Sequence, residues 1–113
     1  MEMDGIIQKV DWKKVGGMLP AIVQDYKTAE VLMLGFMTED SLEKSIELGR
    51  VTFFSRSQNK LWTKGETSGN YLNIRQMALD CDQDTLLILA DPLGDTCHLA
   101  QTSCFEEASK NAS

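Results

Sequence analysis

The stretch MLPAIVQDYKTAEVLMLGFM, residues 18–37, carries the pattern from which we predict the fold. Met18–Asp25 and Val31–Met37 are short apolar runs, and a polar connection of five residues joins them. Two such runs separated by so short a link are typical of a β-hairpin. We therefore expect a pair of antiparallel strands here, to which the rest of the fold is added.

The next segment predicts a helix over residues 39–48. Thr38 is a good N-cap, and two acidic residues follow it in the first turn, where the helix dipole favours anions. Gly49 provides a C-terminal stop. We expect an apolar face to cover one side of a sheet, and it would consist of Leu42, Ile46 and Leu48.

Three later segments predict further strands. Arg50–Ser55 is β-branched and aromatic, Tyr71–Cys81 partly alternates, and Thr85–Ala90 is a continuous apolar run typical of a strand buried on both faces. The glycine-containing residues 57–70 predict a loop, and the segments DQD and DPLGD predict turns. The sum is a single α+β domain over residues 1–113, with a mostly antiparallel sheet, one main covering helix and frayed ends.

The overall composition restricts the classes of function. A length of 113 residues suits one domain, and 42% hydrophobic with 25% charged residues is ordinary for a soluble protein. The net charge of −6 argues against a protein that coats nucleic acid. No apolar run approaches the ~20 residues that span a bilayer, and the N-terminus has no secretory pattern. We expect a cytoplasmic protein with neither nucleic acid nor a membrane as partner.

One segment of this acidic chain is basic. Residues 50–64 contain four cations and no acidic side chain. A positive region of this size suits a small anionic ligand better than a polymer. The alternative is a solvated hairpin loop that happens to be basic.

Residues 80–105 contain the side chains that prefer metals. They comprise three aspartates at alternate positions, all three cysteines and the only histidine: Asp80, Asp82, Asp84, Cys81, Cys97, Cys104 and His98. Carboxylates favour magnesium or calcium, whereas thiolates favour zinc. If the DCD segment is extended, the Cys81 side chain points away from its two aspartate neighbours and serves a different metal. With no counter-cation beside them the aspartates repel one another, which a divalent ion would relieve; a solvated acidic turn is the alternative.

The three cysteines allow two interpretations. Three thiolates leave one tetrahedral position of a zinc ion open, as a catalytic zinc needs for its water. His98, next to Cys97, would then be the available base. Otherwise the cysteines act as small hydrophobes and His98 lies in a surface turn.

Four segments give the chain a resemblance to a known family. VLMLGFM (31–37), SRSQNKLWTKGETSGN (55–70), DCDQDTLL (80–87) and CHLAQTSCF (97–105) resemble, in this order, the phosphoribosyl-AMP cyclohydrolases of histidine biosynthesis. The resemblance implies that a zinc-activated water, with magnesium assistance, opens the adenine ring of phosphoribosyl-AMP at its N1–C6 bond. It also implies an intertwined homodimer with one zinc per subunit, shared across the interface.

The resemblance assigns roles to individual residues. Cys81 of one subunit and Cys97 and Cys104 of the other would bind zinc, and His98 would be the general acid and base. The magnesium ligands would be Asp80, Asp82 and Asp84. Our own inference from the basic loop is that the substrate's phosphates are held by Arg56, Ser57, Lys60, Lys64 and Gly65.

Some positions depart from the family pattern. Leu99 and Ala100 replace a threonine and a glycine, Gln58 replaces a frequent arginine, and Leu72 stands where glutamine is usual. The pyrophosphohydrolase domain often fused in relatives is expected in a separate protein. Two rival functions are a small interaction protein with a purely structural zinc, which the Leu99–Ala100 departure favours, and metal-free nucleotide binding, which leaves the cysteines unexplained.

Overall fold

The predicted hairpin is present in the computed structural model, which describes residues 5–96 and 102–105. Strands β1 (Leu19–Asp25) and β2 (Val31–Met37) are antiparallel, with Leu19 opposite Met37. The register shifts after Val23, where β2 contains an extra residue. The prediction for residues 18–37 is therefore confirmed.

Two later strands complete a four-stranded sheet. β5 (Leu72–Leu79) and β6 (Leu86–Pro92) form a second antiparallel hairpin, and the order is β2-β1-β6-β5. β6 runs parallel to β1, which is the one parallel pair among the described strands. The α+β class with a mostly antiparallel sheet is confirmed. The parallel pair joins residues 65 positions apart, such as Ala21 and Leu86, so local patterns could not predict it.

Helix α2 (Glu39–Leu48) has the predicted limits. The side chains of Thr38 and Ser41 form a reciprocal capping box, and Gly49 ends the helix with a φ of 70°. The predicted apolar face is only partly right, because Leu48 is 45% exposed. Ser41 and Ser45 are buried beside Leu42 instead. The Ser45 hydroxyl accepts a hydrogen bond from the Thr52 backbone N–H at 2.8 Å, so polar contacts help to dock the helix.

Two elements, β4 and α1, were not predicted. β4 (Lys60–Thr63) falls inside the segment expected to be a loop, and it pairs with the predicted strand β3 (Thr52–Ser55). β4 has only four residues, two of them polar, so its own pattern is too short to identify it. Helix α1 (Gly5–Lys9) begins at the edge of the N-terminal segment predicted to fray. Its Ile6 and Ile7 pack against the core, which supplies the stabilisation that a short helix lacks alone.

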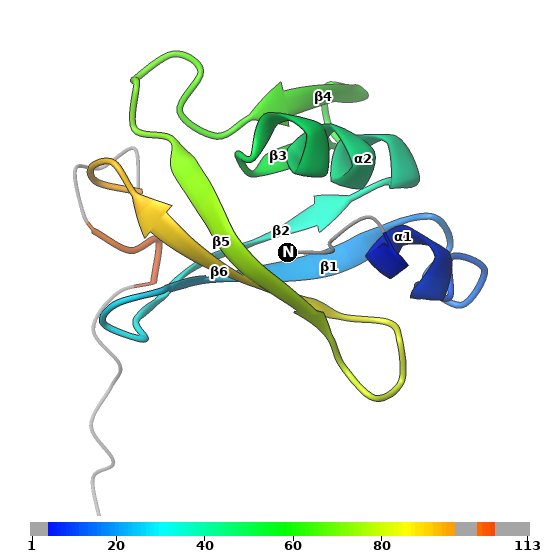
Figure 1. The fold of residues 1–113 in the computed structure, drawn as a ribbon. Helices are drawn as coiled ribbons and strands as arrows, with labels where there is room; N and C mark the ends of the chain where they lie inside the picture. Colours follow the sequence, from blue (N-terminus) through cyan, green and yellow to red (C-terminus); the bar gives the residue numbers. More distant parts are fainter. Residues whose placement is uncertain (1–4, 97–101, 106–113) are drawn as a thin grey trace, which may run out of the picture.

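The core lies between the sheet and the layer of α2 and the β3–β4 hairpin, as Figure 1 shows. Phe53 of β3 is 1% exposed and packs so close to Gly35 of β2 that a Cβ there would lie 2.6 Å from its ring. A glycine is therefore needed for the hairpin to approach the sheet. No helix among the described residues has the length and hydropathy to cross a membrane.

β6 corrects one further expectation. Leu86, Ile88 and Ala90 are fully buried, but Leu87 and Leu89 between them are only half-buried. Within one chain the strand thus has a single buried face rather than two. The expected DPLGD turn also starts late, because Asp91 and Pro92 still belong to β6 and pair with β5.

Candidate metal and substrate site

The three aspartates lie in the turn between β5 and β6. The Asp80 N–H donates to the Thr85 carbonyl at 3.0 Å, and Gln83 adopts a φ of 61°, so the expected hairpin turn is confirmed. One carboxylate oxygen from each of Asp80, Asp82 and Asp84 lies within 4.8 Å of the others. The segment is not extended, so the strand alternation used to separate Cys81 from the aspartates does not apply.

The expectation of an aspartate cluster without a counter-cation is wrong. Lys14, from the turns that precede β1, places its Nζ 3.0 Å from Asp84 Oδ2. Hydrogen bonding with Lys14 and then with Asp80 lowers the pKa of Asp84, and the Asp84 carboxylate raises the pKa of Lys14. The two turns are also joined by a hydrogen bond from the Asp11 N–H to the Gln83 carbonyl.

The donor set of this cluster fits a hard divalent cation. Asp80 Oδ1 accepts hydrogen bonds from the backbone N–H groups of Asp84 and Thr85, which orients its carboxylate while the other oxygen remains available. Asp80 and Asp82 are exposed and Asp84 is half-buried. Oxygen ligands with room for water are what Mg²⁺ prefers.

The two described cysteines, Cys81 and Cys104, lie at opposite ends of the sheet. Cys81 is exposed in the aspartate turn, whereas Cys104 is exposed beside the start of β2, where its N–H donates to the Leu32 carbonyl at 2.7 Å. Figure 1 shows the same separation between the β5–β6 turn and residues 102–105. The strand register places Cys81 near the level of Leu86 and Cys104 near the level of Leu89, and these two β6 residues lie about 10 Å apart along the strand. Because β1 lies between β2 and β6, these two strands are about a further 10 Å apart across the sheet. Cys97 and His98 lie outside the described residues.

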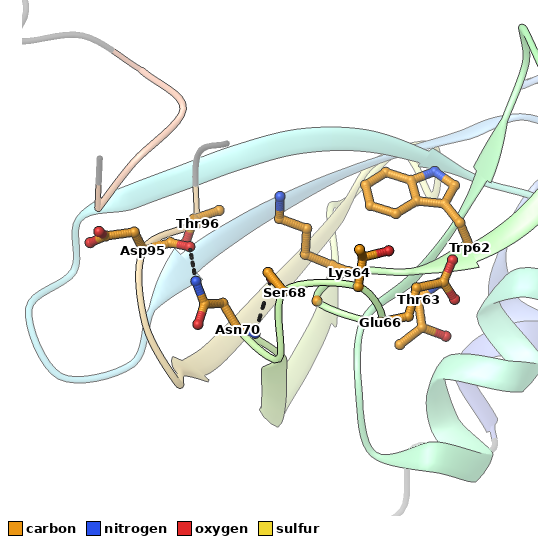
Figure 2. A pocket seen from close by; sticks show the side chains of 10 residues that line it. Trp62, Thr63, Lys64, Glu66, Ser68, Asn70, Asp95 and Thr96 are labelled. Atoms are coloured by element: carbon orange, nitrogen blue, oxygen red, sulfur yellow. Dashed lines mark hydrogen bonds between the residues drawn. The ribbon is translucent and has the colours of Figure 1, made fainter. Parts of the chain in front are cut away.

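A pocket of about 500 Å³ lies beside β4 and the loop that follows it. Figure 2 shows Lys64 extending between Trp62 on one side and Asp95 and Thr96 on the other. Asn70 and Asp95 both line this pocket, and they are joined by a hydrogen bond from Asn70 Nδ2 to the Asp95 carbonyl at 3.2 Å. Thr96, the residue before Cys97, is 1% exposed and its hydroxyl has no hydrogen-bond partner among the described residues.

A second pocket of about 380 Å³ adjoins the first. Ser55, Gln58 and Lys60 line it, and it shares three residues with the larger pocket: Trp62, Glu66 and Thr67. Gln58, which departs from the family pattern, donates its backbone N–H to the Ser55 hydroxyl at 3.2 Å.

The five residues expected to hold phosphate divide between these places. Lys64 and Gly65 line the larger pocket and Lys60 the smaller one. Arg56 and Ser57 line neither; the Arg56 guanidinium lies 4.3 Å from the centre of the Phe36 ring, and the Ser57 hydroxyl lies 3.3 Å from that of Ser55. Leu72, the other described departure, is fully buried, so an apolar side chain suits its place.

Sequence reasoning missed three residues of this region: Trp62, Asn70 and Thr96. Trp62 and Asn70 lie in the segment expected to be a loop, and Thr96 comes directly after the expected DPLGD turn. The only local signal was Trp62, a large aromatic residue between two lysines in the basic segment.

Fold and site together describe a small α+β domain with a carboxylate cluster and two adjoining pockets, each of which contains one lysine. The family model for phosphoribosyl-AMP cyclohydrolase matches residues 33–106. The chain therefore belongs to the phosphoribosyl-AMP cyclohydrolase family.

Curated relatives agree with this family. The histidine biosynthesis bifunctional protein HisIE of Campylobacter jejuni is 62% identical over 105 residues, which cover 93% of this chain and 51% of that protein. The protein of the same name from Haemophilus influenzae is 59% identical over 101 residues, covering 89% and 46%. The one from Escherichia coli O157:H7 is 57% identical over 98 residues, covering 87% and 48%. The chain thus spans about half the length of these relatives.

Proposed function

We propose that this chain hydrolyses the N1–C6 bond of the adenine ring in 1-(5-phosphoribosyl)-AMP, giving the phosphoribosyl-formimino aminoimidazole carboxamide ribotide of histidine biosynthesis. The observation that carries the proposal is the family match over residues 33–106. The lysine-lined pockets support it, because the substrate is a small molecule with phosphate at two ends.

The zinc ligands of this reaction would come from two copies of the chain. Sulfurs that share one zinc lie within about 4 Å of each other, since each Zn–S bond is about 2.3 Å. Cys81 and Cys104 are at opposite ends of one sheet, which is too far apart for a common ion. We therefore propose that each zinc would be bound by Cys81 of one subunit and by Cys97 and Cys104 of the other.

The outer face of the sheet supports a homodimer. Ile22 pairs with Leu34 on one side and Leu87 on the other, so the three side chains share the face that points away from the core. Leu34 is 46% exposed, and the other two are half-buried in the single chain. Covering this apolar face with a second copy would explain why the β6 sequence is continuously apolar.

The residues take the following parts in this proposal. Zinc held by the three thiolates supplies Lewis-acid activation of water, and magnesium would be held by Asp80, Asp82 and Asp84. His98 would move a proton at the purine nitrogen that leaves. The substrate's phosphates would be bound by Arg56, Ser57, Lys60, Lys64 and Gly65.

Metal analysis combined with turnover of phosphoribosyl-AMP tests the function. We expect about one zinc per subunit, ring opening visible by ultraviolet absorbance, and at least a hundredfold loss of kcat in Cys97→Ser. The control is Lys44→Gln on α2, an exposed position outside the proposed metal and phosphate ligands. Zinc-loaded dimeric protein without turnover would instead identify a structural zinc and contradict the proposed enzyme.

A further inference from the structure

We propose that Lys60 and Lys64 bind different phosphates of the substrate, one on each side of Trp62. The inference rests on the proposed function and assigns the two ends of the substrate to the two pockets. It differs from a single phosphate site formed by the whole basic loop.

The position of Trp62 separates the two lysines. Lys60 and Trp62 are two residues apart in β4, so their side chains project to the same side of the strand. Lys64 comes directly after β4, and its N–H donates to the Val51 carbonyl at 3.0 Å. Lys60 lines only the smaller pocket and Lys64 only the larger, whereas Trp62 lines both. The two lysines are four residues apart, about 13 Å along an extended chain.

Both lysines are available for an anion. Within the described part of the chain, ion pairs involve Lys14, Lys44 and Arg75, and neither pocket lysine. The Lys64 ammonium lies 5.8 Å from the centre of the Trp62 ring, and an aromatic ring does not neutralise its charge.

The chemistry of phosphoribosyl-AMP matches this spacing. Its two 5′-phosphates are carried on riboses at opposite ends of a purine, so they cannot occupy one small pocket together. An aromatic residue between the two cations offers a surface on which a purine can stack. Trp62 is itself fixed by packing on Phe53, with ring centres 5.5 Å apart.

Acidic residues in the pockets fit the riboses rather than the phosphates. Glu66 lies in the wall common to both pockets, and its Oε2 accepts a hydrogen bond from the Thr63 N–H at 3.2 Å. Asp95 lines the larger pocket. Carboxylates repel phosphate but accept hydrogen bonds from sugar hydroxyls, so the phosphates should lie toward the lysine of each pocket.

The test compares a substrate with two phosphates and a ligand with one. Lys60→Gln, Lys64→Gln and the control Lys44→Gln on α2 are assayed for the KM of phosphoribosyl-AMP and for the inhibition constant of AMP. Each pocket variant should raise KM about tenfold or more with little change in kcat, because a charge-assisted hydrogen bond is lost. AMP inhibition should weaken about tenfold in one pocket variant and stay unchanged in the other, and the control should match wild type.

Two results would overturn the assignment. Equal weakening of AMP inhibition by both variants would indicate one shared phosphate site, and an unchanged KM in either variant would remove that lysine from the site. Wild-type protein without turnover would overturn the proposed function instead. The midpoint of thermal unfolding is measured for each variant. A midpoint equal to that of the wild type excludes the explanation that the substitution acts only by destabilising the fold.

Discussion

At the scale of single residues, Lys14 supplies a positive charge to the aspartate cluster that was not expected from the sequence. Its ammonium contacts Asp84 at 3.0 Å and so partly relieves the repulsion that a divalent ion was expected to relieve alone. Lys14 and Asp84 are seventy residues apart in the chain, so no local pattern could pair them. The alternate spacing did predict that Asp80 and Asp82 lie on one side, but it assumed an extended segment. The three carboxylates lie together in a turn instead.

Replacing Lys14 should make stability depend differently on pH. The folded pKa of Asp84 is below its ordinary 3.8, so its stabilisation is present above pH 3.8 and is lost as the pH falls through the folded pKa. The folded pKa of Lys14 is above 10.5, so its contribution is complete below pH 10.5 and is lost as the pH rises through the folded value. Lys14→Gln should therefore lower the urea midpoint slightly at pH 7 in metal-free buffer, and the difference from wild type should shrink as the pH falls below 3.8 and through the folded pKa of Asp84. A constant difference down to pH 2 would contradict this; Lys44→Gln is the control.

Thr96 and Thr52 form a matched pair of buried hydroxyls. Both side chains are 1% exposed, but Thr52 Oγ1 lies 2.9 Å from Thr63 Oγ1, whereas Thr96 Oγ1 has no partner among the described residues. Thr52→Val should lower the free energy of unfolding by about 1–3 kcal/mol, because the Thr63 hydroxyl loses its partner. Thr96→Val should leave it unchanged or raise it by about 1 kcal/mol. Equal losses in urea titrations would show that the Thr96 hydroxyl is satisfied after all.

At the scale of elements, the loop after β4 depends on the one glycine that touches another part of the loop. Gly65 has a φ of 93°, and a Cβ on it would lie 2.5 Å from the Asn70 backbone. Gly69, at φ 82°, has nothing within 4 Å of a Cβ. The Gly69 N–H donates to the Gly65 carbonyl at 2.7 Å, so both ends of the loop are tied.

Alanine at these two positions separates backbone strain from steric conflict. Gly69→Ala introduces strain alone and should cost about 1–2 kcal/mol of unfolding free energy. Gly65→Ala adds a clash with the Asn70 backbone and should cost about 2–4 kcal/mol. Because the same loop lines the larger pocket, Gly65→Ala should also raise the KM of phosphoribosyl-AMP. Equal costs in chemical denaturation would mean that the loop yields to the added methyl group.

The elements also show which parts of the fold a sequence can reveal. α2 was predicted to the residue because its signals, Thr38 at the start and Gly49 at the end, are local. β4 was missed because its four residues are too few to show a pattern, and the parallel β1–β6 pair was missed because it joins segments far apart in the chain. The site divides in the same way: the aspartates were found from their spacing, but Trp62 and Thr96 reach one pocket only through the fold.

At the scale of the whole molecule, the sheet holds the proposed zinc ligands apart. Cys81 follows β5 at one end, and Cys104 lies beside Leu32 at the other. In the proposed isologous dimer the two ends would come together twice, since each subunit would offer Cys81 to one site and Cys97 and Cys104 to the other. Every site then contains ligands from both chains, and this makes the arrangement testable by mixing.

Two inactive variants should restore each other when their subunits exchange. Cys81→Ser and Cys104→Ser should each abolish zinc-dependent turnover as homodimers. In the mixed dimer one site receives both serines, while the other receives Cys81 from one chain and Cys97 and Cys104 from the other, and is intact. With equal mixing about half of the dimers are mixed, so about a quarter of wild-type sites should return. Subunit exchange verified by mass-tagged chains, without any recovery of turnover or zinc content, would mean that each site is built from one chain and that the proposed dimer is wrong.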